Sequence, residues 1–228
     1  MLAPLPVGGG TPHFFVQLSR LDALGAVDFA SFTTASLVHG ADDDEVMLGL
    51  ASLPDMVATW RARHPALPLR IGPSAIALRS SPLGAQPPSD GTRRLALAAA
   101  GPRSHARFGA AWALGHVVGV ARVGVEAVTL LALRGPQGVV AQNGAGAARR
   151  PVFDLLAQLG RTARRLAVEV TRPQRVAALA LQRCGEAFVL LANLAAEPVE
   201  VDVVSLSASG TRHALGPYGV PRVDAVAG

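Results

Sequence analysis

Residues 107–138, RFGAAWALGHVVGVARVGVEAVTLLALRGPQG, predict a helix, a tight turn, a buried strand and a glycine-rich loop, in that order. Small and apolar residues recur at helical spacing from Ala110 to Ala121, and Gly124 ends the helix because glycine adopts a left-handed C-cap without steric cost. The mostly apolar run 127–133 is typical of a strand buried on both faces. A helix that leads into such a strand is the unit of a parallel α/β sheet or barrel. The stretch alone does not distinguish a packing unit from part of a site.

The composition indicates one or two globular domains. The chain has 228 residues, 50% of them hydrophobic, which is enough to bury a sizeable core. All 21 basic residues are arginines, they are scattered along the chain, and only 4% of the residues are aromatic. Nucleic-acid binding requires a clustered basic face or stacking aromatic side chains, so the composition argues against a nucleic-acid partner.

The sequence predicts a cytoplasmic protein with no membrane partner. Its start, MLAPLPVGGG, lacks a basic region followed by a long apolar core, as a secretion signal would have. The apolar residues 108–121 contain His116 and are fewer than the roughly 20 that a membrane span requires. The lone Cys184 excludes an internal disulfide and a cysteine-rich zinc site, and its apolar surroundings favour a position in the core. We predict no metal and no cofactor, because no histidine outside the His39 segment has the spacing of a metal ligand and no cofactor motif is present.

Alternation of strand and helix patterns extends over the first 165 residues. Further strands are predicted at residues 13–19, 27–34 and 69–78. Helices are predicted from Glu45, from Ser52 to Arg63 and over residues 151–165, with a glycine-rich loop over 134–150. Apolar runs at 176–182, 187–193 and 199–206 then predict a small antiparallel β module. Residues 1–12 and those from Gly216 onward are predicted to be loops or loose ends.

Four β/α units are half of an eightfold barrel. We therefore predict an α/β fold, a partial (β/α)8 barrel of about four β/α units over residues 1–165, followed by a β-rich domain over residues 166–228. Half a barrel leaves two open parallel edges. Three arrangements remain open: a small open sheet, a barrel closed by a second copy, and a truncated piece of a longer chain.

Six segments between Gly8 and Leu206 fall in one order: HFFVQLSR, VDFASFTTASLVHGADDDE, IGPSAIALR, RFGAAWALGHVVGVARVGVEAVTLLALRG, RVAALALQR and FVLLANLAAEPVEV. That order resembles the C-terminal half of the D-apionate lactonase family, whose members resemble clan-A glycoside hydrolases. The resemblance implies a (β/α)8 barrel with a C-terminal β domain. It also implies a sugar-acid lactone or carbohydrate as ligand and hydrolysis of an ester bond as the reaction.

Two positions depart from the family pattern. A pattern resembling ELNR surrounds the first strand of the family, and Gln17 stands here in place of the glutamate. A pattern resembling YYETxGWRG follows the fourth strand, and Ala132 stands in place of its glutamate. Glycosidase-type chemistry needs two carboxylates at one bond, and neither an amide nor an alanine acts as a general base or nucleophile. The sequence therefore predicts little or no lactonase activity from this chain alone.

His39, Asp42 and Asp43 are the catalytic candidates that remain. They follow the second strand, on the face where barrel sites form, and His39 matches a VHxxDD pattern of the family. A carboxylate would orient the imidazole, or the group would bind a sugar hydroxyl or a metal ion. The alternative is that the aspartates cap the next helix and His39 is a loop residue.

Four residues near strand ends are candidates for substrate binding. They are Arg20, Thr34, Arg79 and Arg134. A guanidinium group presents a fork of donors that fits the carboxylate or hydroxyls of a sugar acid, although each arginine is also interpretable as a solvated side chain. A second hypothesis is a non-catalytic carbohydrate-binding or assembly module, which forms a homodimer or pairs with a separate N-terminal half of the barrel.

Overall fold

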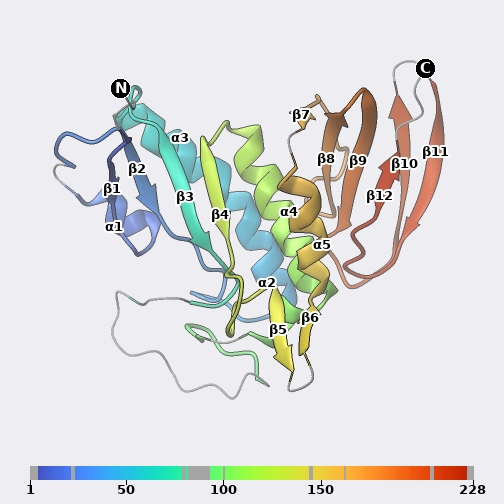
Figure 1. Cartoon of the computed structure of the whole chain (residues 1–228), viewed down its shortest axis with the longest axis horizontal. Helices are drawn as coiled ribbons and strands as arrows, with labels where there is room; N and C mark the ends of the chain where they lie inside the picture. The colour runs from blue at the N-terminus through green and yellow to red at the C-terminus, as the bar shows by residue number, and fades with distance from the viewer. Residues whose placement is uncertain are drawn as a thin grey trace. The chain divides into compact units, whose positions relative to one another are not determined.

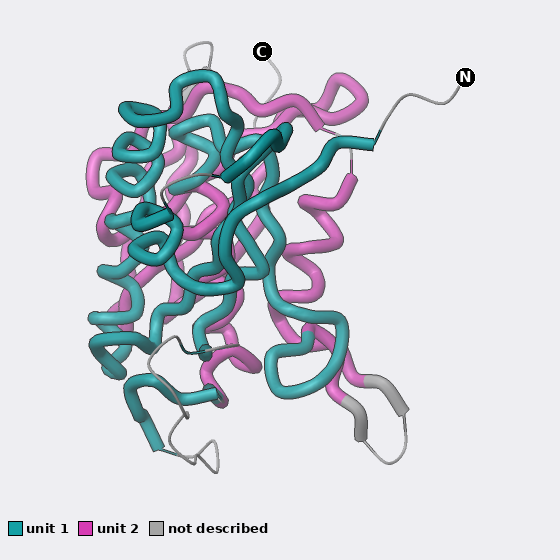
Figure 2. The backbone as a smooth tube through the Cα atoms, turned by 90° about the vertical axis from the view of Figure 1, so that its left-hand side faces the viewer, with its two compact units in different colours: residues 1–101, 119–138 teal, residues 102–118, 139–228 magenta. Residues whose placement is uncertain are grey.

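The computed structural model describes the chain except for residues 1–4, 22–23, 79–80, 82–92, 100, 144–145, 162, 206–207 and 225–228. The chain divides into two compact units (Figure 2). Unit 1 consists of residues 1–101 and 119–138, and unit 2 consists of residues 102–118 and 139–228. Helix α4 (Arg107–Arg122) contributes its first three turns to unit 2 and its end to unit 1.

Unit 1 is built on a four-stranded sheet (Figure 1). Its strands are β1 (Gly8–Gly10), β2 (Phe29–Phe32), β3 (Leu69–Ser74) and β4 (Ala127–Leu130), and they lie side by side in chain order. Every neighbouring pair is parallel. The carboxyl ends of all four strands therefore lie at one edge, as in successive β/α units of a barrel.

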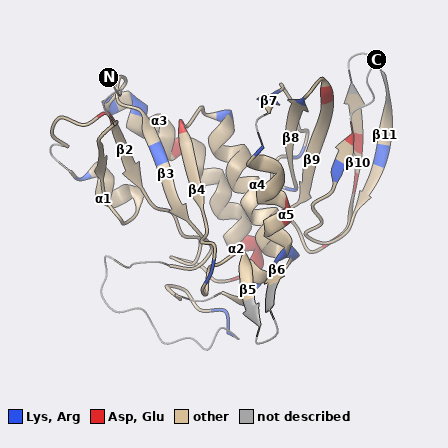
Figure 3. Ribbon diagram, in the orientation of Figure 1, with Lys and Arg blue, Asp and Glu red and all other residues tan. Residues whose placement is uncertain are grey.

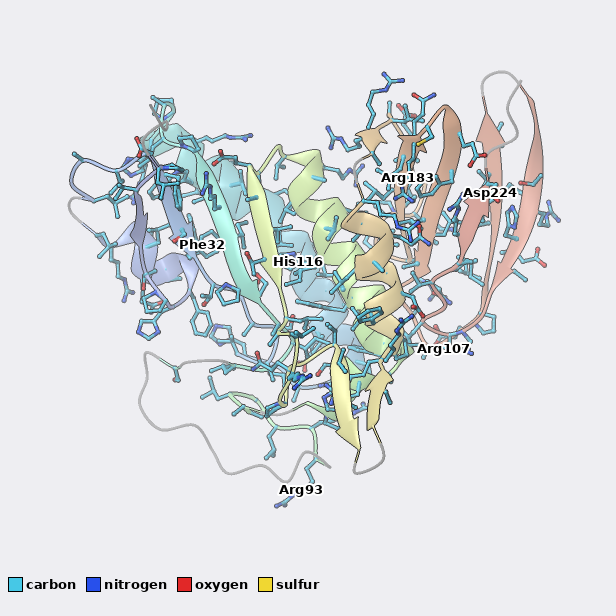
Figure 4. The ribbon with its side chains drawn as sticks, viewed as in Figure 1. Phe32, Arg93, Arg107, His116, Arg183 and Asp224 are labelled. Carbon is cyan, nitrogen blue, oxygen red and sulfur yellow. The ribbon has the colours of Figure 1, made fainter. Side chains whose placement is uncertain are left out.

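The core of unit 1 lies between this sheet and helix α3 (Leu53–Arg63). Phe32 of β2, which Figure 4 labels, and Ile71 of β3 belong to one buried cluster with Val57 and Trp60 of α3. The Trp60 Nε1–H donates to the carbonyl oxygen of Leu67 at 3.1 Å, so burial of the indole leaves no unpaired donor. Full burial of each large apolar side chain contributes about 1.5–3 kcal/mol, which makes this layer the main stabilising feature of unit 1.

Three short elements complete the helices of unit 1. They are α1 (Phe15–Ser19), α2 (Asp43–Leu48) and the 3-10 turn η1 (Gly49–Ser52). The predicted helix ends are confirmed at two places. Asp42 is the N-cap of α2, and Ser52 precedes α3, whose first turn contains Pro54. The Ser52 hydroxyl does not cap that helix, because it donates to the carbonyl oxygen of Gly49 at 2.7 Å.

The other face of the sheet carries a partly exposed polar cluster at the amino ends of the strands. The Arg70 guanidinium lies 3.6 Å from the centre of the Phe29 ring and pairs with Glu126 at 2.8 Å. The hydrogen bond from Arg70 lowers the pKa of the Glu126 carboxyl below its ordinary value. Glycine at position 8 leaves room for the Phe29 ring beneath Arg70, because a Cβ at that position would collide with the ring.

Helix α4 ends where the sequence predicts. Gly124 has φ +66°, the left-handed conformation that favours glycine. Its carbonyl oxygen accepts a hydrogen bond from Arg61 Nη2 at 2.9 Å. The turn between α4 and β4 therefore depends on a backbone conformation that residues other than glycine adopt only with strain.

Gly124→Ala is expected to destabilise unit 1 by about 1 kcal/mol, because alanine is strained at a positive φ. A Cβ at Gly124 would meet only the end of the Arg61 side chain, at 3.5 Å, so the cost comes from the backbone alone. The matched control is Gly49→Ala, where φ is −55° and a Cβ would meet nothing within 4 Å. Urea unfolding of both variants measures the difference, and equal midpoints would contradict the assignment.

The C-terminal part of unit 2 contains two antiparallel sheets. One has the order β12 (Arg222–Asp224), β9 (Glu186–Asn193), β8 (Val176–Arg183) and β7 (Arg164–Arg165). The other pairs β10 (Val199–Ser205) with β11 (Ala208–Leu215). The hairpin from β8 to β9 turns through Cys184 and Gly185, with φ of 50° and 86°, as two-residue hairpin loops require. The predicted fold class, a partial α/β barrel followed by an antiparallel β domain, is confirmed.

The remaining elements of unit 2 precede these sheets. They are η2 (Pro102–His105), the first part of α4, the hairpin of β5 (Val140–Asn143) with β6 (Gly146–Arg149), and helix α5 (Pro151–Leu159). The predicted domain boundary after residue 165 stays a prediction. Among the described residues, no helix is long and apolar enough to cross a membrane.

Two predictions near the N-terminus are wrong. Residues 13–19 are not a strand, because residues 15–19 form α1, where Phe15 packs edge-on against Phe32 with 5.4 Å between ring centres. The first strand is instead Gly8–Gly10, within the segment predicted to be a loop. A triple glycine has little strand propensity of its own, and its conformation follows from parallel pairing with β2.

Further corrections concern exposure and later segments. The fourth strand ends at Leu130, and Ala127 and Thr129 are exposed because β4 is an outer strand of the sheet rather than one buried on both faces. Cys184 is exposed in a turn and not in the core. The glycine-rich loop contains the hairpin β5–β6, and helix α5 stops at Leu159 instead of Arg165. The segment after Gly216 contains β12, which pairs with the distant β9.

Candidate functional site

The carboxyl edge of the parallel sheet holds a pair of hydroxyl groups. Thr34, just beyond β2, donates through Oγ1 to Oγ of Ser74, the last residue of β3, at 2.7 Å. Ser74 is fully buried, and Thr34 is half-buried. Backbone bonds fix both residues, since Ala75 N donates to the Thr34 carbonyl oxygen at 3.1 Å and Leu131 N donates to that of Ser74 at 2.8 Å. Thr34 thus lies close to the end of β2, and its role in substrate binding stays a prediction.

Gln17 lies on α1, beyond the carboxyl end of β1. Its Oε1 atom is buried and, among the described residues, has no hydrogen-bond partner. An unpaired buried acceptor costs about 1–3 kcal/mol, and such groups deserve an explanation in a folded protein. Arg20, predicted to end a strand, is instead the exposed C-cap residue of α1.

The segment after β4 presents a methyl group at the position of the second expected carboxylate. Ala132 is half-buried, and its N–H donates to the carbonyl oxygen of Gln137 at 3.1 Å. The Gln137 side chain in turn donates through Nε2 to the carbonyl oxygen of Leu78 at 2.9 Å. Arg134 is exposed in the tight turn between them. The turn is thus held by backbone groups and an amide, and the side chain at position 132 supplies no acid.

The three catalytic candidates lie in the loop after β2 and in the first turn of α2. Asp42 forms a capping box with Glu45, whose Oε2 accepts a hydrogen bond from Asp42 N at 3.1 Å. Arg94 pairs with Asp43 at 2.9 Å and lies 3.9 Å from Asp42. His39 is exposed in the preceding turn, and within the described part of the chain no hydrogen bond or ion pair joins it to either aspartate.

This arrangement supports the capping role for Asp42. It does not test catalysis by His39, Asp42 and Asp43, which stays a prediction. Arg79 lies outside the described residues. Figure 3 shows the basic residues distributed over many elements of the chain. In the described ranges, no group of three or more His, Cys, Asp and Glu side chains is placed to hold a metal ion.

Ser74 and Gln137 were missed by the sequence analysis. Each is polar among apolar neighbours, at the end of a strand or just after one. That signal is weak, because their roles depend on partners 40 and 59 residues away in the chain. Arg94 was missed for the same reason, since its partners lie in the first turn of α2.

Comparisons with known proteins identify the family. The TIM barrel domain of D-apionate lactonase matches residues 1–164, and the C-terminal immunoglobulin-like domain of D-apionate lactonase matches residues 173–223. A D-apionate lactonase of Brucella anthropi is 32% identical over 221 residues, which are 94% of this chain and 35% of that protein. The chain therefore spans about a third of the length of this curated relative.

Solved structures of glycosidases share the fold. An α-L-arabinofuranosidase of Thermotoga maritima, in an arabinose complex, superposes with a TM-score of 0.54 at 12% identity over 88% of this chain and 53% of that chain. The family 51 α-L-arabinofuranosidase AbfB of Bifidobacterium longum gives 0.52 at 11% identity over 80% and 42% of the two chains. At such identities the likeness shows the fold alone. On the strength of the matches to both of its domains, the chain belongs to the D-apionate lactonase family.

Proposed function

We propose that this chain binds a sugar-acid lactone at the carboxyl edge of its parallel sheet and does not hydrolyse the lactone by itself. The observation that carries the proposal is the pair of positions Gln17 and Ala132. One follows the carboxyl end of β1 and the other that of β4, and both lack the carboxylate that the family resemblance expects. The substrate class is supported by the relative that is 32% identical and named a D-apionate lactonase.

Hydrolysis of a lactone has two chemical requirements. A general base takes a proton from the attacking water, and hydrogen-bond donors stabilise the oxyanion that forms at the carbonyl carbon. Neither an amide nor a methyl group accepts the proton. Recognition of a sugar requires only donors and acceptors at fixed positions, and the half-buried hydroxyl of Thr34, which the buried Ser74 holds in place, supplies one of these. The groups at the carboxyl edge of the sheet therefore favour binding of the lactone over its hydrolysis.

The binding claim is tested by saturation-transfer NMR with a pentono-1,4-lactone. We expect Thr34→Val to weaken binding about 5-fold, the equivalent of roughly 1 kcal/mol for one lost hydrogen bond. The matched control is Thr59→Val on α3, because the exposed Thr59 hydroxyl bonds only within its own helix, to the Asp55 carbonyl oxygen at 2.8 Å. Circular dichroism checks that both variants fold. Absence of a lactone signal in the native protein, or equal affinities of the two variants, would overturn the proposal.

A second candidate function is assembly, and the open sheet favours it. The four described strands of unit 1 leave β1 and β4 as outer strands, each with one unpaired side. Pairing of these sides with four further parallel strands would close an eight-stranded barrel. The strands would come from a second copy or from a separate N-terminal half. Light scattering distinguishes these outcomes: a homodimer has twice the 23.4 kDa of the chain, and a monomer with no co-purifying partner contradicts assembly.

A further inference from the structure

Unit 2 contains a cavity of about 530 Å³, and all of its lining residues belong to that unit. The first turn of α4, one face of α5 and the segment 214–222 line it. Volumes of about 300–1,000 Å³ are usual for sites that bind small molecules. Nothing in the proposed function involves this cavity.

The charged groups at the cavity favour an anion. Arg107, the first residue of α4, is exposed and makes no ion pair with any described residue (Figure 4). Arg222 pairs with Asp224 at 2.8 Å, and its guanidinium lies 4.2 Å from the centre of the Phe188 ring, which holds the group in place. Asp154 is the only acid among the lining residues, and because Arg222 is already paired with Asp224, Arg107 is the lining cation that no described acid pairs with.

The other lining groups suit a ligand with hydroxyls and an apolar face. The Asp154 carboxylate accepts hydrogen bonds from hydroxyl groups, and the Gln158 amide both donates and accepts. Tyr218 presents a ring that packs edge-on against Phe108, with 4.8 Å between the ring centres. Leu155 and Leu190 complete an apolar floor. Such a floor packs against the C–H groups of a carbon chain, while a guanidinium binds a carboxylate in bidentate fashion.

We propose that this cavity binds a sugar acid, a small carboxylate with a hydroxylated carbon chain. The carboxylate pairs with Arg107 and Arg222, and the hydroxyls face Asp154 and Gln158. The starts of α4 and α5 both lie at the cavity, and their backbone dipoles add to the attraction for a negative charge. The site is distinct from the Thr34–Ser74 edge, and the proposal stands whether or not that edge binds a lactone.

Titration of the ¹⁵N-labelled chain with D-gluconate tests the proposal. We expect saturable shifts of amide signals in α5 and in residues 216–222. Arg107→Gln is expected to weaken gluconate binding by about tenfold, since it removes one charge-assisted bidentate contact. The matched control is Arg122→Gln, which removes an exposed arginine at the opposite end of the same helix and leaves the affinity unchanged.

Several outcomes would overturn the assignment. The first is the absence of saturable shifts in the native protein, and the second is unchanged affinity in Arg107→Gln. The third is an equal affinity for acetate, because that would show a simple anion site with no recognition of hydroxyls. Neutral D-glucitol is expected not to bind. Amide shifts that map to unit 1 instead of α5 would assign gluconate binding to the sheet edge and would contradict binding in the cavity.

Discussion

Asn193→Leu is expected to destabilise unit 2 by about 2–4 kcal/mol. Asn193 is fully buried at the end of β9. Its Nδ2 donates to the carbonyl oxygens of Glu197 at 2.8 Å and Gly216 at 3.0 Å, and its Oδ1 accepts from Ala195 N at 3.0 Å. One side chain therefore joins the turn before β10 to the end of β11. Leucine has a similar volume, but it leaves these backbone groups buried and unpaired.

Native-state hydrogen exchange of the β8 and β9 amides measures this loss within unit 2. The matched control is Gln174→Leu, which makes the same chemical change at an exposed position of the same unit. That control is expected to change stability by no more than about 0.5 kcal/mol. If Asn193→Leu also changed stability by no more than this amount, the Asn193 amide would not be what holds the turn before β10 to the end of β11.

Acidification is expected to destabilise the protein between pH 6.5 and pH 4 through His116. This residue is almost fully buried on α4 (Figure 4). The centre of its ring lies 5.2 Å from that of Trp112. Burial disfavours the charged imidazolium and lowers the pKa of His116 from 6.5 to about 4. The unfolded chain, with its ordinary pKa, binds a proton over this range while the folded chain does not. The free energy of unfolding is therefore unaffected by protonation of His116 above pH 6.5 and declines as the pH falls. At pH 4 the decline amounts to about 3 kcal/mol.

Urea unfolding at pH 7.5 and pH 4.5 measures this decline. In His116→Asn the difference between the two pH values is expected to shrink by most of that amount, whatever the variant's stability at neutral pH. The matched control is His39→Asn, which makes the same replacement at an exposed histidine. A pH dependence retained in His116→Asn would show that other groups cause the acid instability.

Elements with a strong local pattern were predictable from the sequence. Helix α4 and its end at Gly124 follow from apolar spacing and one glycine, and the β8–β9 hairpin follows from two apolar runs around Cys184-Gly185. Elements whose conformation depends on distant partners were not. The strand Gly8–Gly10 exists because it pairs with β2, and β12 exists because it pairs with β9, some 30 residues earlier in the chain.

The same distinction applies to the candidate site. Thr34 follows a recognisable strand, so its place at the carboxyl edge was predictable. Its partner Ser74 was not, because their hydrogen bond joins residues 40 positions apart. The capping role of Asp42 is local and was among the alternatives considered. The buried, unpaired oxygen of Gln17 follows only from the packing of α1, which the sequence wrongly predicted to be a strand.

The most direct test is the rate at which the purified chain hydrolyses a D-apionate-type lactone, followed by proton release at constant pH. With Gln17 and Ala132 in place of the expected carboxylates, the rate is predicted to equal that of the lactone in buffer, at every protein concentration. A rate that increases with protein, saturates with lactone and falls in His39→Gln would contradict the account and would assign catalysis to the loop after β2.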